Sequence, residues 1–277
     1  ADRDLPVRLA AAGAELVFNI AEGSRGRSRE AQVPALCEML GLACTGSDAV
    51  ASAVSLDKAL SKRLLRDAGI PTPRFSLLQT GREPLAADLR YPLIAKPNLE
   101  GTSKGLGAES VVDDERALRA LAGKLLERYR QPVIVEEYIA GRELTVGLIG
   151  HPRARALPPM EVVFRGGEPR PVYGYAYKQD FCEQVVFERP ARLAGEERAR
   201  VERAALEAFE ALGCRDVARV DLRLDAAGTV WVLEVNPLPG LSPGWSDLCL
   251  ITEAAGIPYR DLVGEILAGA RARRGSG

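Results

Sequence analysis

Residues 218–240 read ARVDLRLDAAGTVWVLEVNPLPG, which is typical of two strands joined by a short turn. Successive side chains of a strand point to opposite faces, and a short turn makes consecutive strands antiparallel neighbours. We therefore expect Asp221, Glu234 and Asn236 to lie close together on one face of a sheet, with Arg219 beside them.

This expected cluster has a chemical consequence. Two carboxylates and an amide oxygen are unfavourable neighbours unless a cation lies between them, and hard oxygen ligands suit Mg²⁺. The alternative is a solvated strand face whose charges pair with Arg223. The proline- and glycine-rich loop after Asn236 favours the metal site, because the backbone amide of Gly240 could stabilise a developing oxyanion there.

A glycine-rich segment lies at residues 93–107 and reads LIAKPNLEGTSKGLG, beginning as an apolar strand up to Lys96. Its glycines allow the backbone to approach phosphate groups, and the hydroxyls of Thr102 and Ser103 add donors. It matches neither the P-loop nor the dinucleotide fingerprint, so an ordinary hairpin loop is the alternative. Lys58, on a preceding helix, is a second candidate for contact with phosphate. Its alternative is a solvated surface lysine.

Residues 132–146 read PVIVEEYIAGRELTV, which predicts a strand, a turn and a second strand. An exposed strand edge can bind adenine through main-chain groups. Glu136 could accept a hydrogen bond from the exocyclic amine, and Glu143 could accept from ribose hydroxyls. The alternative is that both glutamates are simply solvated at the strand ends.

Helices and strands alternate in the rest of the chain. The expected helices span residues 7–12, 31–40, 55–68, 114–130, 195–212 and 259–271. The expected strands outside the hairpin span residues 16–20, 75–78, 92–96, 132–138 and 143–149. Ser55 is expected to cap the third helix. The first 50 residues supply only a stub of a doubly wound domain.

Composition narrows the classes of function. The 277 residues carry a formal net charge of −1, which gives no reason to expect nucleic acid or a membrane as partner. The only histidine is His151, so a Ser–His–Asp triad or a zinc site built on histidines is nearly excluded. The 5 cysteines form no C-x-x-C pair, which indicates free thiols and a cytoplasmic location.

Taken together, these segments resemble the D-alanine–D-alanine ligase branch of the ATP-grasp family. The matching motifs are FNIAEG (18–23), TGSDAVASAVSLDKALSK (45–62), IAKPNLEGTSKG (94–105), VEEYIAGRELTV (135–146), ARVDL (218–222), LEVNPLPG (233–240) and AAGIPYRDLV (254–263). The resemblance implies an α/β protein with the ATP-grasp fold and a truncated Rossmann-like N-terminal lobe. The implied lobes are residues 1–54, a central lobe at 55–135 and a catalytic lobe at 136–277.

The resemblance also implies roles for individual residues, with ATP lying between the last two lobes. Residues implied to bind the nucleotide are Lys58, Lys96, Thr102, Ser103, Glu136, Glu137, Tyr138, Glu143 and Lys178. Residues implied to bind Mg²⁺, or Mn²⁺ in its place, are Asp221, Glu234 and Asn236. Residues implied to act in catalysis are Arg219 and Gly240, at the oxyanion, and Ser103, in the loop over the γ-phosphate.

The implied reaction is ATP-dependent carboxylate–amine ligation in two steps. A carboxylate attacks the γ-phosphorus of ATP, and an amine then attacks the acyl phosphate. The substrates would be small amino acids or peptides. Family members dimerise through the N-terminal lobe, so a homodimer is a possible assembly.

Several substrate positions depart from the family pattern. Glu22 replaces a histidine, and Gln179 replaces the tyrosine that usually follows the position of Lys178. We therefore predict that D-alanyl-D-alanine is not the principal product. Ser246 is a candidate for holding the carboxylate of the second substrate, with a helix N-cap as its alternative. The competing functions are an ATP-binding module without turnover and a ligase with a hydroxyl acceptor.

Overall fold

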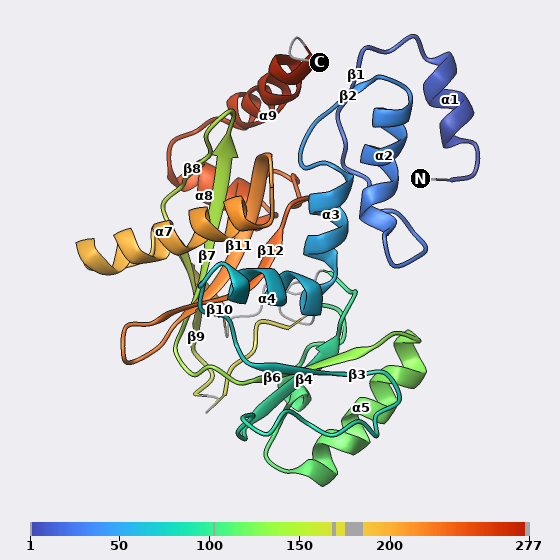
Figure 1. The fold of residues 1–277 in the computed structure, drawn as a ribbon. Helices are drawn as coiled ribbons and strands as arrows, with labels where there is room; N and C mark the ends of the chain where they lie inside the picture. Colours follow the sequence, from blue (N-terminus) through green and yellow to red (C-terminus); the bar gives the residue numbers. More distant parts are fainter. Residues whose placement is uncertain (1, 102, 168–169, 175–184, 275–277) are drawn as a thin grey trace.

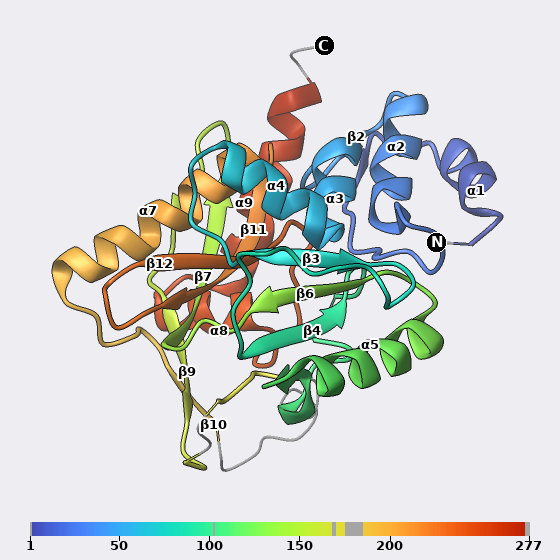
Figure 2. The ribbon, with the colours of Figure 1, turned by 60° about the horizontal axis from the view of Figure 1, so that its bottom comes forward.

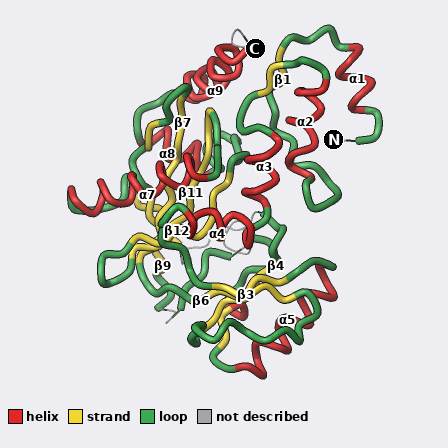
Figure 3. Tube along the Cα trace, in the orientation of Figure 1, coloured by secondary structure: helices red, strands yellow, loops and turns green. Residues whose placement is uncertain are grey.

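The computed structural model describes residues 2–101, 103–167, 170–174 and 185–274. Its strands form three separate sheets, and each sheet belongs to one lobe of the molecule. Figure 1 shows the blue N-terminal lobe beside the orange and red C-terminal lobe, with the green central lobe below them. Coloured by secondary structure, the same view shows helices packed against the strands in all three lobes (Figure 3). Within the described ranges, no helix is long and apolar enough to cross a membrane.

The N-terminal lobe is small. Its elements are α1 (Leu5–Ala11), β1 (Leu16–Val17), the 3₁₀ turn η1 (Arg29–Ala31), α2 (Gln32–Met39) and β2 (Ala43–Cys44). The two strands pair in parallel and form the whole sheet of this lobe. The strand expected at 16–20 ends early because the amide of Asn19 bonds to the Thr45 hydroxyl at 2.8 Å instead of to a strand.

The single helix expected over residues 55–68 is wrong. The chain forms two helices there, α3 (Ala49–Leu56) and α4 (Lys58–Asp67). Ser55 is buried inside α3, so it is not the N-cap. Asp57 caps α4 instead, accepting a hydrogen bond from the Leu60 amide at 3.1 Å. Asp57 also accepts from Asn98 Nδ2 at 2.8 Å, so the break between the helices is stabilised by a distant loop.

The central lobe is a four-stranded antiparallel sheet covered on one face by a helix (Figure 2). Its elements are β3 (Phe75–Leu78), β4 (Leu93–Pro97), η2 (Ala108–Ser110), β5 (Val111–Val112), α5 (Glu115–Tyr129) and β6 (Val133–Glu137). Leu93 and Ala95 pack with α5 in the core of the lobe. The alternating residue Lys96 therefore points to the opposite face. Strand β6 runs through residue 135, where the lobe boundary was expected.

The C-terminal lobe is built on a six-stranded sheet of order β10-β9-β7-β11-β12, with β8 paired to β7. Its elements are β7 (Arg142–Gly150), β8 (Arg155–Ala156), β9 (Met160–Phe164), β10 (Val185–Glu188), α7 (Gly195–Ala211), β11 (Asp216–Leu224), β12 (Val230–Asn236), α8 (Asp247–Ala254) and α9 (Tyr259–Arg274). Leu144 and Val146 pack with α7, while Ile149 packs with α8 and α9. A Cβ at Gly147 would lie 2.7 Å from Leu248 Cδ1, so the glycine allows α8 to lie close to β7.

Candidate active site

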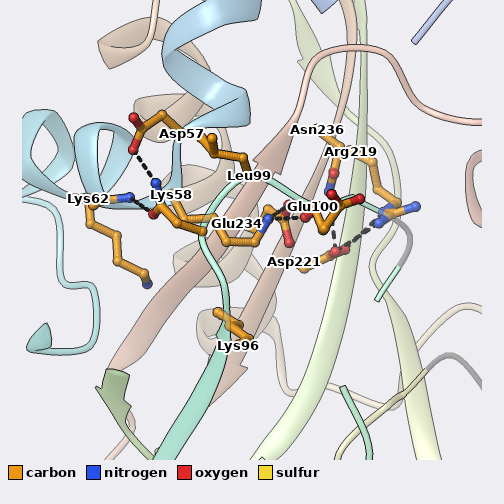
Figure 4. A network of polar contacts seen from close by, with 12 residues as sticks. Asp57, Lys58, Lys62, Lys96, Leu99, Glu100, Arg219, Asp221, Glu234 and Asn236 are labelled. Atoms are coloured by element: carbon orange, nitrogen blue, oxygen red, sulfur yellow. Dashed lines mark hydrogen bonds and ion pairs between the residues drawn. The ribbon is translucent and has the colours of Figure 1, made fainter. Parts of the chain in front are cut away.

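The expected hairpin is confirmed. Strands β11 and β12 pair antiparallel, with Asp221 opposite Glu234 and Arg219 opposite Asn236. The simple alternation assumed for β12 is interrupted, because the register shifts between Asp221 and Leu222. The Asn236 amide nitrogen lies 3.3 Å from Asp221 Oδ2, so the amide and this carboxylate face the same space. Figure 4 shows these side chains gathered on one face of the hairpin. Arg223 pairs with another strand instead, which removes the simple alternative in which it neutralises this cluster.

Arg219 forms ion pairs with two carboxylates, those of Asp221 and Asp247. Its Nε and Nη2 atoms each donate to Asp221 at 2.9 Å, and its Nη1 atom lies 3.1 Å from Asp247 Oδ2. Burial opposes the guanidinium charge, but the Asp221 and Asp247 carboxylates outweigh it and raise the pKa of Arg219. Arg219 is therefore a fixed positive charge beside Asp221, Glu234 and Asn236, which we call the metal-type cluster.

Lys58, the first residue of α4, reaches the same cluster. Its Nζ atom donates to Glu234 Oε1 at 2.8 Å and also to the backbone carbonyl of Glu100 (Figure 4). Its side chain is only 4% exposed. The alternative of a solvated surface lysine is therefore excluded. The helix α4 that carries Lys58 starts at this point because Asp57 and Asn98 fix it there.

A second charged cluster lies under the glycine-rich loop. Lys96 Nζ lies 3.1 Å from both carboxylate oxygens of Glu136, and Lys62 Nζ lies 3.5 Å from Glu136 Oε2. Burial would raise the pKa of Glu136, but Lys62 and Lys96 outweigh it and lower that pKa. Burial lowers the pKa of Lys62 to about 8. Oε1 of Glu136 is buried and accepts no hydrogen bond of good geometry from the described residues.

The nucleotide edge, which is the strand edge at residues 132–146 that was expected to bind adenine, carries an ion pair. Arg223 Nη2 donates to Glu143 Oε2 at 2.6 Å, and its guanidinium lies 4.8 Å from the centre of the Tyr138 ring. The Tyr138 hydroxyl donates to the Pro171 carbonyl at 3.0 Å. Glu143 is therefore held in place rather than simply solvated.

These clusters open into one pocket between the central and C-terminal lobes. The expected site residues in its wall are Lys96, Ser103, Glu136, Glu137, Tyr138, Glu143, Asp221 and Glu234. Lys58, Arg219 and Asn236 are not in the wall but bond to residues that are. Gly240 is exposed in the loop after β12, outside the wall. Thr102 and Lys178 lie outside the described residues.

Several wall residues were missed by the sequence reasoning, including Thr145, Tyr173 and Asp247. Thr145 Oγ1 donates to Asp221 Oδ1 at 3.1 Å. Thr145 lies opposite Asp221 because β7 pairs with β11, and the sequence alone did not predict that pairing. Asp247 directly follows Ser246, which was a candidate for binding the carboxylate of the second substrate. The Ser246 hydroxyl accepts from the Ser242 amide at 3.0 Å and makes no side-chain cap bond.

The oxygen donors fit a hard cation. Within the described ranges no group of three or more His, Cys, Asp or Glu side chains could hold a metal ion. The cluster here instead joins two carboxylates to one amide, and the Asp221 and Glu234 side chains are 24% and 22% exposed. A site with few protein ligands that is open to the pocket is typical of Mg²⁺, which retains waters and binds substrate phosphates.

The raised pKa of Glu30, in the N-terminal lobe, predicts that the stability of the fold depends on pH. Burial raises the pKa of Glu30 to about 7, and Arg29, Glu22, Lys58 and Glu234 are its charged neighbours. Because the folded chain then binds the proton more tightly than the unfolded chain, stability falls as pH rises from about 5 to about 7. We expect Glu30→Gln to raise the free energy of unfolding by about 2 kcal/mol at pH 8, measured by urea denaturation.

The matched control is Glu38→Gln, because Glu38 is an exposed acid of the same lobe on α2. This variant should leave the free energy of unfolding within about 0.5 kcal/mol of the wild type at pH 5 and at pH 8. A Glu30→Gln protein that shows the same fall in stability between pH 5 and pH 8 as the wild type would contradict the assignment.

Comparison with known proteins agrees with this geometry. The family model described as D-ala D-ala ligase C-terminus matches residues 64–268. A D-alanine–D-alanine ligase from Cupriavidus taiwanensis is 38% identical over 265 residues, covering 95% of this chain and 77% of the relative. The uncharacterized protein y4sG from Sinorhizobium fredii is 37% identical over 266 residues, covering 96% of this chain and 77% of that protein.

Solved structures give the same result. The D-alanine–D-alanine ligase from Bacillus anthracis, complexed with ATP, matches with a TM-score of 0.79 at 28% identity, covering 99% of this chain and 85% of that one. The VanG D-Ala:D-Ser ligase from Enterococcus faecalis matches with a TM-score of 0.77 at 25% identity, covering 92% and 73%. The fold is that of an ATP-grasp ligase. This chain belongs to the D-alanine–D-alanine ligase family, whose members are ATP-dependent, amide-forming ligases.

Proposed function

We propose that this chain activates the carboxylate of an amino acid or small peptide as an acyl phosphate and transfers the acyl group to an amine. The observation that carries the proposal is the pairing of Asp221 with Glu234 beside Lys58, in the pocket that the nucleotide edge also lines. Binding of ATP alone would not require Arg219 next to these carboxylates. A catalytic role therefore fits better than a binding module without turnover.

The divalent ion would be held by Asp221, Glu234 and Asn236. When bound, Mg²⁺ would offset the charge of the phosphate groups. Lys58 and Lys96 would bind phosphate oxygens, and Ser103 would lie over the γ-phosphate.

Protein groups would also orient the adenosine. Oε1 of Glu136 lies 3.1 Å from Lys96 Nζ but accepts no hydrogen bond of good geometry from the described residues, so it could accept one from the exocyclic amine of adenine. The backbone near Glu137 and Tyr138 would contact the ring, and Glu143 would accept from ribose hydroxyls. Lys178 is proposed to act near the nucleotide, and Thr102 in the loop over the γ-phosphate.

In the second step a C–N bond forms and the C–O bond to the phosphate breaks. The amine loses a proton, and inorganic phosphate leaves with the bonding electrons. Arg219 would stabilise the negative oxygen of the tetrahedral intermediate, and the Gly240 amide is proposed as the second donor. Because Glu22 and Gln179 replace family residues, we propose that D-alanyl-D-alanine is not the principal product.

Release of inorganic phosphate from Mg²⁺-ATP tests the proposal when it is screened against pairs of amino acids, dipeptides, amines and hydroxy acids. We expect release that depends on both a carboxylate and an amine, with one amide formed per phosphate. Tight ATP binding without release would favour a binding module, and ester formation would favour a hydroxyl acceptor. Formation of D-alanyl-D-alanine as the fastest product would contradict the altered substrate.

A further inference from the structure

An acidic side chain without an assigned role closes the pocket beyond Arg219. Asp247 is the first residue of α8, and its side chain is 12% exposed in the pocket wall. Its Oδ2 atom lies 3.1 Å from Arg219 Nη1. No described residue donates a hydrogen bond to the Asp247 carboxylate at good geometry, so it keeps acceptor capacity toward the pocket.

The position of Asp247 along the pocket follows from β11. Arg223, Asp221 and Arg219 follow one another along this strand, from the nucleotide edge at Glu143 through the metal-type cluster to the far end. Asp247 contacts the last of these three. It therefore lies on the side of the cluster away from the adenosine edge, where a second substrate would enter.

Charge at this end disfavours an acceptor that carries a free carboxylate. Lys58 is paired with Glu234, and Arg219 is shared between Asp221 and Asp247. If a divalent ion takes Asp221 and Glu234, Arg219 is left with Asp247 as its partner. A carboxylate next to the incoming amine would then compete with Asp247 for Arg219 and lie close to a like charge.

We infer that Asp247 is a specificity-determining residue that selects an acceptor amine with a second positive charge, such as a small diamine, in place of an amino acid with a free carboxylate. This inference rests on the proposed function. The nucleophilic nitrogen would face Arg219, while the second ammonium group would pair with the Asp247 carboxylate.

A matched acceptor series tests this inference without turnover. Glycine, glycinamide and ethylenediamine share a two-carbon backbone and differ in a carboxylate, an amide or an amine at one end. Their dissociation constants can be measured by calorimetry with the full chain, Mg²⁺ and a non-hydrolysable ATP analogue. We expect ethylenediamine to bind at least about tenfold more tightly than glycine, with glycinamide between them.

Asp247→Asn should remove this preference, because the amide keeps the shape of the side chain and loses its charge. The control is Asp261→Asn, which changes an exposed acid in the first turn of α9 and should keep the wild-type order. The inference is overturned if glycine binds the wild type as tightly as ethylenediamine, if ethylenediamine does not bind, or if Asp247→Asn keeps the order.

Different results would overturn the ligase function and the role of Asp247. Phosphate release that depends on a carboxylate and an amine, combined with glycine as the preferred acceptor, would overturn only the role of Asp247. Selective binding of ethylenediamine without phosphate release would overturn the ligase function and leave the selectivity of the pocket supported.

Discussion

Replacing Glu234 with glutamine is expected to lower phosphate release from Mg²⁺-ATP by about a hundredfold to a thousandfold. The change keeps the shape of the side chain but removes one of the two carboxylate charges of the cluster. It also leaves the buried ammonium of Lys58 without the ion pair that it now makes at 2.8 Å. Steady-state kinetics at saturating substrates, with Mg²⁺ titrated from low concentration, measures both the fall in kcat and any rise in the Mg²⁺ requirement.

Glu253→Gln is the control for this change. Glu253 is 69% exposed on α8, where it lies 3.5 Å from Arg189. Its replacement should leave kcat within about twofold of the wild type, because an exposed ion pair contributes little. Wild-type phosphate release by the Glu234→Gln protein would show that this cluster does not bind the metal, and the proposed assignment of Asp221 would fail with it.

The hairpin was predictable because its signal is local. The exact register was not part of this signal, because alternation from Leu224 opposite Val230 would set Asp221 opposite Leu233, and a register shift next to Asp221 brings Glu234 there instead. The antiparallel pairing of the two strands follows from the short turn. A local signal also predicts the helix at 115–129 and Lys96 at the end of an apolar strand. Each of these predictions needed only residues that are neighbours along the chain.

Contacts between distant segments could not be predicted in this way. Lys62 and Glu136 are both almost fully buried, and they meet only because the fold brings α4 beside the end of β6. Alone in the sequence, each resembles a solvated charge. The break at Asp57 depends on Asn98, and the importance of Asp247 depends on Arg219. A polar residue whose role is set by a partner far away in the sequence gives no periodic signal.

One such contact joins the N-terminal lobe to the rest of the molecule. Asp216 has a fully buried side chain, which pairs with both terminal nitrogens of Arg273 and accepts from the Gly46 amide at 2.8 Å. Arg273 Nη2 also donates to the Cys44 carbonyl at 2.9 Å. The ion pair thus connects β11 and α9 to the loop after β2.

Asp216→Asn is expected to destabilise the chain by about 3 kcal/mol in urea denaturation, because it leaves the Arg273 charge without its buried partner. Asparagine is a suitable replacement because Asp216 has φ of 59°, a conformation that asparagine tolerates better than most residues. The loop it releases leads into α3 and then α4, which carries Lys58. We therefore also expect earlier protease cleavage within the N-terminal lobe.

A double-mutant cycle with Arg273→Gln separates the ion pair from general damage to the fold. Each single variant leaves one buried charge unpaired, whereas the double variant leaves none, so its loss of stability should be smaller than the sum of the two. Arg271→Gln, at an exposed position of the same helix, should have little effect. Additive losses in the cycle would contradict the coupling. If the coupling is measured but phosphate release is unchanged, the position of Lys58 does not depend on this lobe contact.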